Sequence, residues 1–568
     1  MMNGYFGAGD WAVIALYLLG IIALGLWFGK DQRNTRDYFL GSRNVPWWCI
    51  GLSIVAAETS ALTIIGVPAM AYGGDIAFLQ MILGYVAARI ILAVVLVPRY
   101  FKGELYSPYQ LFADTFGASA RQTAAGLFLV SETLAAGVRV YVASIPVNLM
   151  LGDKLLGWGT GNPVLGAILL FVLLSLLYTC VGGVKAVIWT DAVQFGLFVL
   201  GGAFALGYIP TLVEGGAGAV LAKAMAGHKL HWLNLAPDPG TSVARFLLGP
   251  PFNLWMGVIG GTVLVLSSHG AEQLIVQRVL ACKSVRDGRR ALVLSAVLIF
   301  PLFLIFLLVG AMLWVYYQGH PFRLALPEPR PGIKANDFIF PIFIITEAPH
   351  LLKGFLIVAI LSAAMSSVSS ALTSLASVST MDFLKPMLPG RSEGFLLRSS
   401  KLSTVLWAAA LIGVAYASRQ AEFVLNAAFS LRGLTSGALL GGLGLALFWR
   451  KGRPGPVIIG MLASLAALTA IQALPKLSAT RGLWMKTIGT EVFWPWYTLI
   501  GAAITVAIAV LGKGDCTPGG DVPGLSLGAA PASAKQAGAA PPSSPISRTP
   551  VVFFRKSRLW VIISESAP

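Results

Sequence analysis

The stretch from Leu361 to Thr380, LSAAMSSVSSALTSLASVST, carries the residue types and spacing with most chemical potential. Ten of its twenty residues bear hydroxyl groups, although it lies in an apolar segment long enough to span a bilayer. Its small and hydroxyl-bearing residues recur at i, i+3, i+4 and i+7, one stripe of an α-helix: Ala363, Ser366, Ser367 and Ser370, with Ser369 beside them. Lipid would not tolerate this face, so we expect it to look into protein.

Two interpretations of this stripe stay open on the helix alone. Neutral oxygens suit a small hard cation, which prefers several oxygen ligands. Small residues also allow two helices to approach closely, so the same stripe would serve as a packing seam.

The composition is that of a polytopic membrane protein. Of 568 residues, 56% are hydrophobic and 11% are charged, whereas soluble proteins carry about 25% charged residues. The formal net charge of +17 would suggest nucleic-acid binding in a soluble protein. Here the basic residues fall mostly in alternate loops, as the bias of Lys and Arg toward the cytoplasm predicts. We therefore expect a lipid bilayer, and no nucleic acid, as the partner.

Apolar windows predict about thirteen membrane spans. They lie near 10–29, 46–72, 77–98, 123–150, 162–181, 186–213, 248–277, 288–317, 350–380, 400–418, 422–449, 455–474 and 492–512. The basic loops, in which we count Arg121 and Arg278, place the N-terminus outside and the C-terminus in the cytoplasm of a plasma (inner) membrane protein. Residues 513–568, rich in Gly, Ala, Pro and Ser over their first part, are expected to form a disordered cytoplasmic tail.

Two spans contain features that interrupt helices. The second reads GLSIVAAETSALTIIGVPAMAYGG and holds a carboxylate, three hydroxyls, a glycine and a proline in its middle. The seventh has Gly260 and Gly261 at its centre and Ser267, Ser268 and His269 further on. A spacing of five spans fits two inverted five-helix repeats with a binding site where the broken helices meet.

Three segments resemble signatures of the sodium:solute symporter family. They are GGVKAVIWTDAVQ (182–194), AEQLIVQRVLA (271–281) and the serine stretch ending in STMDFLK (379–385), and the likeness covers about residues 10 to 512. The resemblance implies an all-α membrane protein with a leucine-transporter-type core. It implies a first peripheral span with its loop at 1–45, a ten-helix core at 46–449 and two peripheral spans at 450–512.

The resemblance also implies sodium sites. One ion would be held by carbonyl and side-chain oxygens of spans 2 and 9, at positions matching Ala56, Thr59, Ala363, Ser366 and Ser367. A second would lie toward the cytoplasm, where Asp191, Ser369 and Ser370 match the family's ligands. Asp191 would otherwise line the cytoplasmic exit or pair with Lys185.

A solute pocket is expected near the same breaks. Its candidate residues are Glu58, Ser60, Thr63, Phe78, Gln80, Arg139, His269 and Phe429. Arg139 would bind a solute carboxylate through its planar fork or would neutralise Glu58 or Glu132. His269 stands where sugar transporters of the family carry an aromatic gate residue, and it is either a gate, a proton carrier or a satisfied core group.

The function expected from these observations is sodium-coupled import of a small organic solute, such as a carboxylate or a sugar, by alternating access. We expect two sodium ions per cycle and a functional monomer. The alternatives are a membrane sensor on a transporter scaffold and a passive solute channel. An enzyme is disfavoured, because the sequence shows no metal cluster, nucleophile–base pair or phosphate loop.

Overall fold

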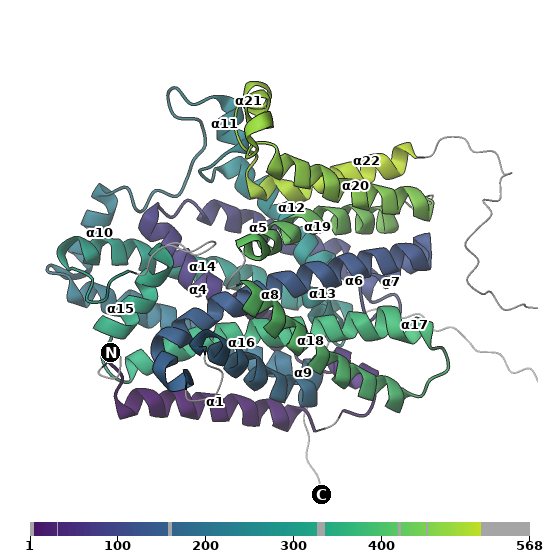
Figure 1. Ribbon diagram of the computed structural model, residues 1–568, viewed down its shortest axis with the longest axis horizontal. Helices are drawn as coiled ribbons and strands as arrows, with labels where there is room; N and C mark the ends of the chain where they lie inside the picture. Colours follow the sequence, from purple (N-terminus) through teal and green to yellow (C-terminus); the bar gives the residue numbers. More distant parts are fainter. Residues whose placement is uncertain are drawn as a thin grey trace, which may run out of the picture. The chain divides into compact units, whose positions relative to one another are not determined.

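The computed structural model describes residues 5–30, 32–156, 162–326, 335–418, 422–449 and 452–512, and the predicted tail at 513–568 lies outside them. These residues form helices and connecting turns (Figure 1). Within them, a lone bridge between Val45 and Cys282 is the one β-type pairing. The all-α prediction is confirmed.

In the part of the chain that the structure describes, fourteen α-helices overlap the predicted spans over most of their length. They are α1 (Ala8–Phe28), α3 (Trp47–Glu58), α4 (Ala61–Gly73), α5 (Leu79–Val95), α8 (Ala118–Leu156), α9 (Pro163–Tyr208), α12 (Gly261–Gly270), α13 (Gln273–Leu280), α14 (Val285–Gly319), α16 (Leu352–Val378), α18 (Glu393–Ser418), α19 (Glu422–Phe448), α20 (Pro454–Ala473) and α22 (Tyr497–Leu511). Shorter helices include α2 (Thr35–Leu40), α6 (Val97–Tyr100), α7 (Gln110–Phe116), α10 (Gly216–Ala226), α11 (Val243–Leu248), α15 (Ile339–Glu347), α17 (Lys385–Met387) and α21 (Ser478–Thr487).

The predicted count of thirteen spans is not confirmed, although each predicted range overlaps a helix. Among the described residues, eight helices are long and apolar enough to cross a membrane, or nine if the bent pair α3–α4 is one span. α5 is a shorter apolar helix, and α9 joins two predicted spans. Gly183 marks that junction, because its dihedral angles (φ 54°, ψ −156°) leave the helical region and its Cα faces the Tyr38 carbonyl.

Both interrupted spans are broken in the structure. α3 and α4 meet at 57°, and the chain leaves helical geometry at Thr59. The seventh span breaks at Ala271 and Glu272, between α12 and α13, and not at Gly260 and Gly261. Those glycines lie where a π-helical turn (Met256–Gly260) meets α12, and they serve close packing.

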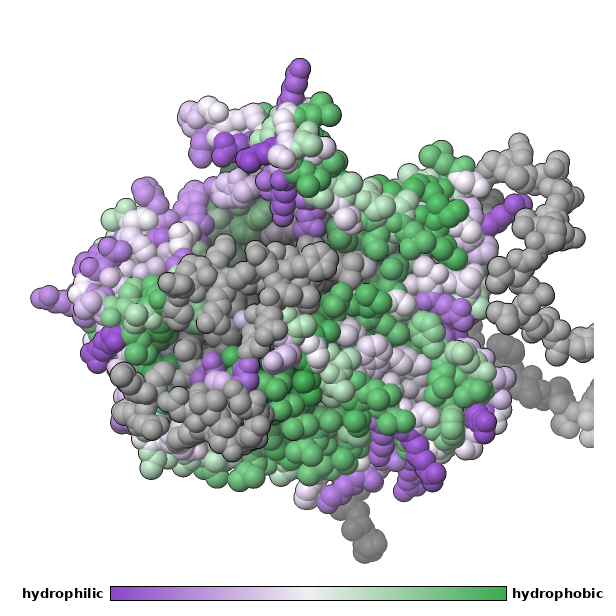
Figure 2. Space-filling view, viewed as in Figure 1, coloured by the Kyte–Doolittle hydropathy of each residue, from purple (hydrophilic) through white to green (hydrophobic). Residues whose placement is uncertain are grey.

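α16 lies at the centre of the helix packing. It contacts α9, α8, α1, α18, α3, α4 and α13, and its residues from Leu356 to Val378 are buried. The expectation that its hydroxyl face looks into protein is confirmed. By contrast, α1 and α18 expose leucines such as Leu16 and Leu406, and Figure 2 shows hydrophobic residues gathered over this part of the surface.

The long connection after α9 holds the C-terminal end of α4, the second half of the broken span. Lys229, which follows α10, donates from Nζ to the carbonyls of Tyr72 and Gly74, at 2.8 Å each. A cation at a helix C-terminus satisfies its last carbonyls and complements its dipole. Burial lowers the pKa of Lys229, and nearby Asp75 opposes this shift.

We predict that Gly84→Val disrupts the crossing of α5 with the π-helical turn and α12. A Cβ at Gly84 would lie 2.2 Å from the Gly257 carbonyl oxygen and 2.7 Å from the Thr262 amide nitrogen, and backbone cannot yield as a side chain does. The expected loss is at least ~2 kcal/mol of stability, measured by thermal unfolding in detergent. Gly126→Ala is the control, since nothing lies within 4 Å of the added atom. Equal melting temperatures for the two variants would contradict this packing.

Candidate functional site

The break in the second span exposes backbone oxygens. Thr59 adopts an extended conformation (ψ 99°), and the Ser60 amide donates to the Thr63 hydroxyl (3.3 Å) as the next helix begins. Ala56 lies in the last turn of α3, where carbonyls lack amide partners within the helix. The buried Thr59 hydroxyl has no hydrogen-bond partner among the described residues. This donor set of neutral oxygens fits a sodium ion.

Three serines of α16 donate their hydroxyl protons to carbonyls of the same helix. Ser367 donates to the Ala363 carbonyl (3.0 Å), and Ser369 and Ser370 both donate to the Ser366 carbonyl (3.0 and 2.6 Å). A hydroxyl that donates its proton keeps lone pairs for a cation. The hydroxyl stripe is therefore compatible both with a helix seam and with ion coordination.

Asp191 of α9 is fully buried in a network that joins four helices. Its Oδ1 accepts from Ser366 of α16 (2.6 Å), and its Oδ2 accepts from Ser53 of α3 (2.6 Å) and from Arg278 Nη2 of α13 (2.9 Å). Arg278 also donates to the hydroxyls of Ser53 (2.8 Å) and Ser370. The cation beside Asp191 is thus Arg278, and not Lys185.

This arrangement corrects the assignment of two arginines to cytoplasmic loops. Arg278 is fully buried. Arg121, which is partly buried, pairs with the buried Asp382 (2.8 Å) and donates to the Met381 carbonyl (2.7 Å). Arg278 belongs to the AEQLIVQRVLA segment, and this motif could have indicated a role inside the protein. The count of basic residues in loops did not consider it.

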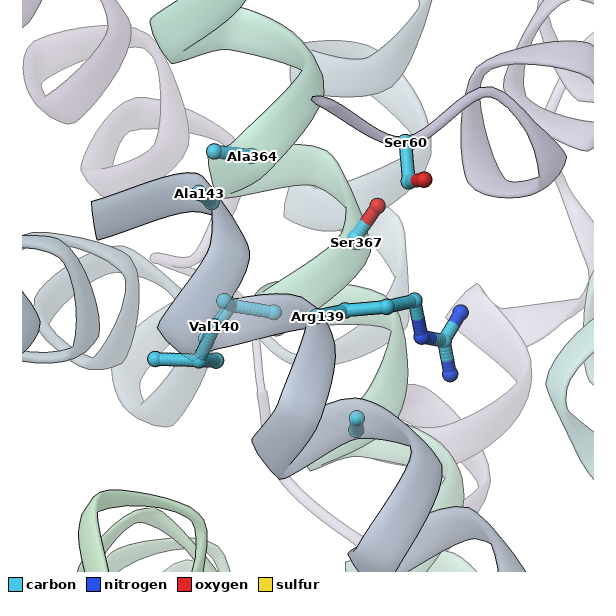
Figure 3. Close-up of a pocket in the computed structure, with 8 residues that line it drawn as sticks. Ser60, Arg139, Val140, Ala143, Ala364 and Ser367 are labelled. Carbon is cyan, nitrogen blue, oxygen red and sulfur yellow. The ribbon is translucent and has the colours of Figure 1, made fainter. Parts of the chain in front are cut away.

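Arg139 pairs with Glu132, seven residues earlier on α8, and not with Glu58. It also donates from Nε to the Ala135 carbonyl (3.2 Å). Figure 3 shows Arg139 extending from α8 near Ser60 and Ser367, with the Ser367 hydroxyl directed toward Ser60. These three residues line one cavity together with Ala136, Val140, Ala143, Ala364 and Val368. Its volume of about 10 Å³ is near the room that one water molecule needs, so the pocket is closed.

Glu58 meets a different arginine. Arg89 of α5, fully buried, donates to the Glu58 carboxylate, and its Nη2 lies 3.1 Å from His269 Nε2. Sequence reasoning missed Arg89, although a single arginine inside the apolar run of α5 was a usable signal. Glu58 and His269 therefore lie together, on the two broken spans.

Three further solute candidates, Gln80, Phe78 and Thr63, make other contacts. The Gln80 amide donates to the carbonyls of Ala77 and Phe252 and accepts from the Asn234 amide, so it holds the loop between α10 and α11. Phe78 packs edge-on against Phe252, with ring centroids 5.1 Å apart. Thr63 supports the break through Ser60. The side chain of Phe429 lies outside the described residues.

Comparisons with known proteins place this site in context. Residues 38–463 match the model of the Sodium:solute symporter family. The human sodium/iodide cotransporter is 29% identical over 84% of this chain and 70% of its own length. The sodium/sialic acid symporter SiaT of Proteus mirabilis (strain HI4320) is 29% identical over 82% of this chain and 90% of its own. The sodium-coupled monocarboxylate transporter 1 of Xenopus laevis is 27% identical over 82% and 71%.

A solved structure agrees with the sequence comparisons. It is a substrate-bound, outward-open Na⁺-coupled sialic acid symporter, 25% identical, with a TM-score of 0.75 over 89% of this chain and 98% of that one. The expected fold, sodium as the coupling ion and the absence of an enzymatic role all agree with these relatives. This chain therefore belongs to the sodium:solute symporter family and is a sodium-coupled membrane transporter with a leucine-transporter-type core.

Proposed function

We propose that the chain imports a small organic monocarboxylate together with sodium. The observation that carries this proposal is the cavity that Arg139 lines together with Ser60 and Ser367 (Figure 3). A guanidinium recognises a carboxylate through two parallel hydrogen bonds. Ser367 is also a predicted ligand of the first sodium, so solute and ion would bind side by side. The solute would share Arg139 with Glu132.

Charge balance favours an anion over a neutral solute. Glu132 with Arg139 and Glu58 with Arg89 are already matched pairs, and the first sodium site offers neutral oxygens. A sodium ion at the first site therefore adds one positive charge in a low-dielectric interior, and a monoanion offsets that charge. A second sodium ion would leave one net positive charge, which the membrane potential drives inward. Three relatives are named as transporters of iodide, monocarboxylates and sialic acid, and these names agree with an anionic solute.

Transport by alternating access is consistent with the closed cavity. A space of about 10 Å³ admits no organic solute, so α4, α8 and α16 must move apart for binding. A site that closes to this extent favours a transporter over a passive channel. We further propose that spans 2 to 11 form the moving core of a monomer. Its N-terminus would lie outside and its C-terminus in the cytoplasm of the plasma (inner) membrane.

Removing two ligands of the first sodium is expected to abolish transport. The change is Ser366→Ala with Ser367→Ala, which deletes two of about five oxygens around a desolvated ion. Sodium-driven solute uptake into proteoliposomes should fall to background while the protein inserts and folds. Ser374→Ala is the matched control, because this buried serine of α16 likewise donates to a backbone carbonyl (3.0 Å). Unchanged sodium dependence in the double variant would reject the site.

The solute class is tested at Arg139. Wild-type uptake from a panel of carboxylates, sugars, amino acids and vitamins should favour monocarboxylates. Arg139→Lys keeps the charge but loses the planar fork, so we expect KM for the preferred carboxylate to rise at least tenfold with little change for sodium. An uncharged preferred solute, or an Arg139→Lys variant with wild-type KM, would show that Arg139 only neutralises Glu132.

The sodium stoichiometry is proposed to be two, with Asp191, Ser369 and Ser370 contributing to the second site. One sodium with a monoanion moves no net charge, and a tenfold sodium gradient then supplies about 1.4 kcal/mol, or tenfold accumulation. Two sodium ions add a net inward charge worth about 2.3 kcal/mol per 100 mV. The total of about 5.1 kcal/mol allows roughly 5,000-fold accumulation.

Transport of one sodium ion with a monoanion is electroneutral, whereas transport of two sodium ions with a monoanion carries current. Reversal potentials in proteoliposomes at several sodium gradients should report two sodium ions per solute in the wild type. Asp191→Asn should bring the Hill coefficient for sodium to one and make transport electroneutral. The lost carboxylate leaves Arg278 buried without its counter-ion, which costs about 3–5 kcal/mol, so Asp191→Asn with Arg278→Gln controls for folding. An electroneutral wild type would remove the second site.

A further inference from the structure

Arg89 forms a buried charge cluster that neither the sodium sites nor the solute cavity includes. Its Nη1 donates to the Tyr85 carbonyl (3.0 Å), and its Nη2 contacts both Glu58 and His269. Because an arginine has only donors, the contact with His269 Nε2 requires that this nitrogen accepts. His269 Nδ1 then carries the proton and donates to the Ser268 hydroxyl (2.9 Å). His269 Nε2 also lies 3.7 Å from a Glu58 carboxylate oxygen, so the cluster brings one carboxylate, one guanidinium and one imidazole together.

Glu58 lies next to the residues predicted to bind the first sodium ion. It is the last residue of α3 and directly precedes Thr59, so its carboxylate stands at the helix end where the Ala56 and Thr59 carbonyls are predicted to bind sodium. A negative charge at a helix C-terminus is unfavourable for the helix. The same charge attracts a cation bound at that end.

Arg89 acts against this attraction. Its guanidinium contacts the Glu58 carboxylate directly, so it cancels most of the field that Glu58 would exert on a neighbouring ion. The cluster also ties α3 to α12 through His269, which holds the two broken spans together. An ion site in a transporter must bind and also release its ion, and partial cancellation weakens binding without removing a ligand.

We propose that the Glu58–Arg89 pair sets the sodium affinity of the first site, with Glu58 strengthening binding and Arg89 weakening it. This inference rests on the proposed first sodium site. It assigns Arg89 a tuning role toward the ion rather than contact with it. An electrostatic role predicts opposite effects for the two residues, whereas a purely structural role predicts weaker binding from either change.

The test is a sodium titration of the purified full-length protein without solute, followed by tryptophan fluorescence and by sodium-dependent thermal stabilisation. The Kd for sodium should rise about tenfold in Glu58→Gln, because Arg89 is then uncompensated, and fall several-fold in Arg89→Gln. Glu58→Gln with Arg89→Gln should return the Kd close to the wild-type value. Arg323→Gln, which breaks the ion pair of the exposed Arg323 with Glu347, is the control and should leave the Kd unchanged.

Two outcomes separate this inference from the function on which it rests. A wild-type protein without any sodium response contradicts the sodium site itself, and with it the inference. A responsive wild type in which both single changes raise the Kd contradicts the tuning role alone. If Arg89→Gln does not fold, the sodium Kd of Glu58→Gln is compared with that of the double variant. The double variant must bind sodium more tightly than Glu58→Gln, and an equal or higher Kd overturns the proposal.

Discussion

The buried pair of Asp191 and Arg278 is the interaction on which the rest of the structure depends. Both side chains are fully buried, and a lone charge in such a place would cost several kcal/mol. Their hydrogen bonds reach Ser53 of α3 and the serines Ser366 and Ser370 of α16, so one half of each broken span meets the helix that carries the candidate serine ligands. Any movement of α13 relative to α9 must rearrange these bonds, which couples the charge network to conformational change.

The interior of the molecule holds its charges as matched pairs. Glu58 with Arg89, Glu132 with Arg139 and Asp382 with Arg121 repeat the pattern of Asp191 with Arg278. Three of these four pairs join different helices and one lies within α8. Because these fixed charges are already matched, an ion or a charged solute that enters this low-dielectric region is not offset by a spare opposite charge of these pairs.

The serine stripe of α16 is suited both to close helix packing and to ion coordination. The side chains are short enough for α9, α8 and α3 to pack closely around the helix, as a seam requires. The hydroxyls of Ser367, Ser369 and Ser370 donate to carbonyls of the same helix, so their oxygens keep lone pairs for a cation. Close packing and ion coordination therefore make compatible demands on the same residues.

The sequence by itself determined the membrane class, the helical architecture, the broken spans and the family, because hydropathy, helix breakers and motifs are local properties of the chain. The family resemblance also predicted Ser60 and Arg139 for the solute pocket and Ser367 for the first sodium site, and these three residues line one cavity. Only the tertiary structure decided which charges meet. Asp191 faces Arg278 rather than Lys185, Arg139 faces Glu132, and Glu58 faces Arg89, a residue that no sequence pattern had connected to it. A buried charge selects its partner by distance across helices, and distance between helices is set by packing rather than by spacing along the chain.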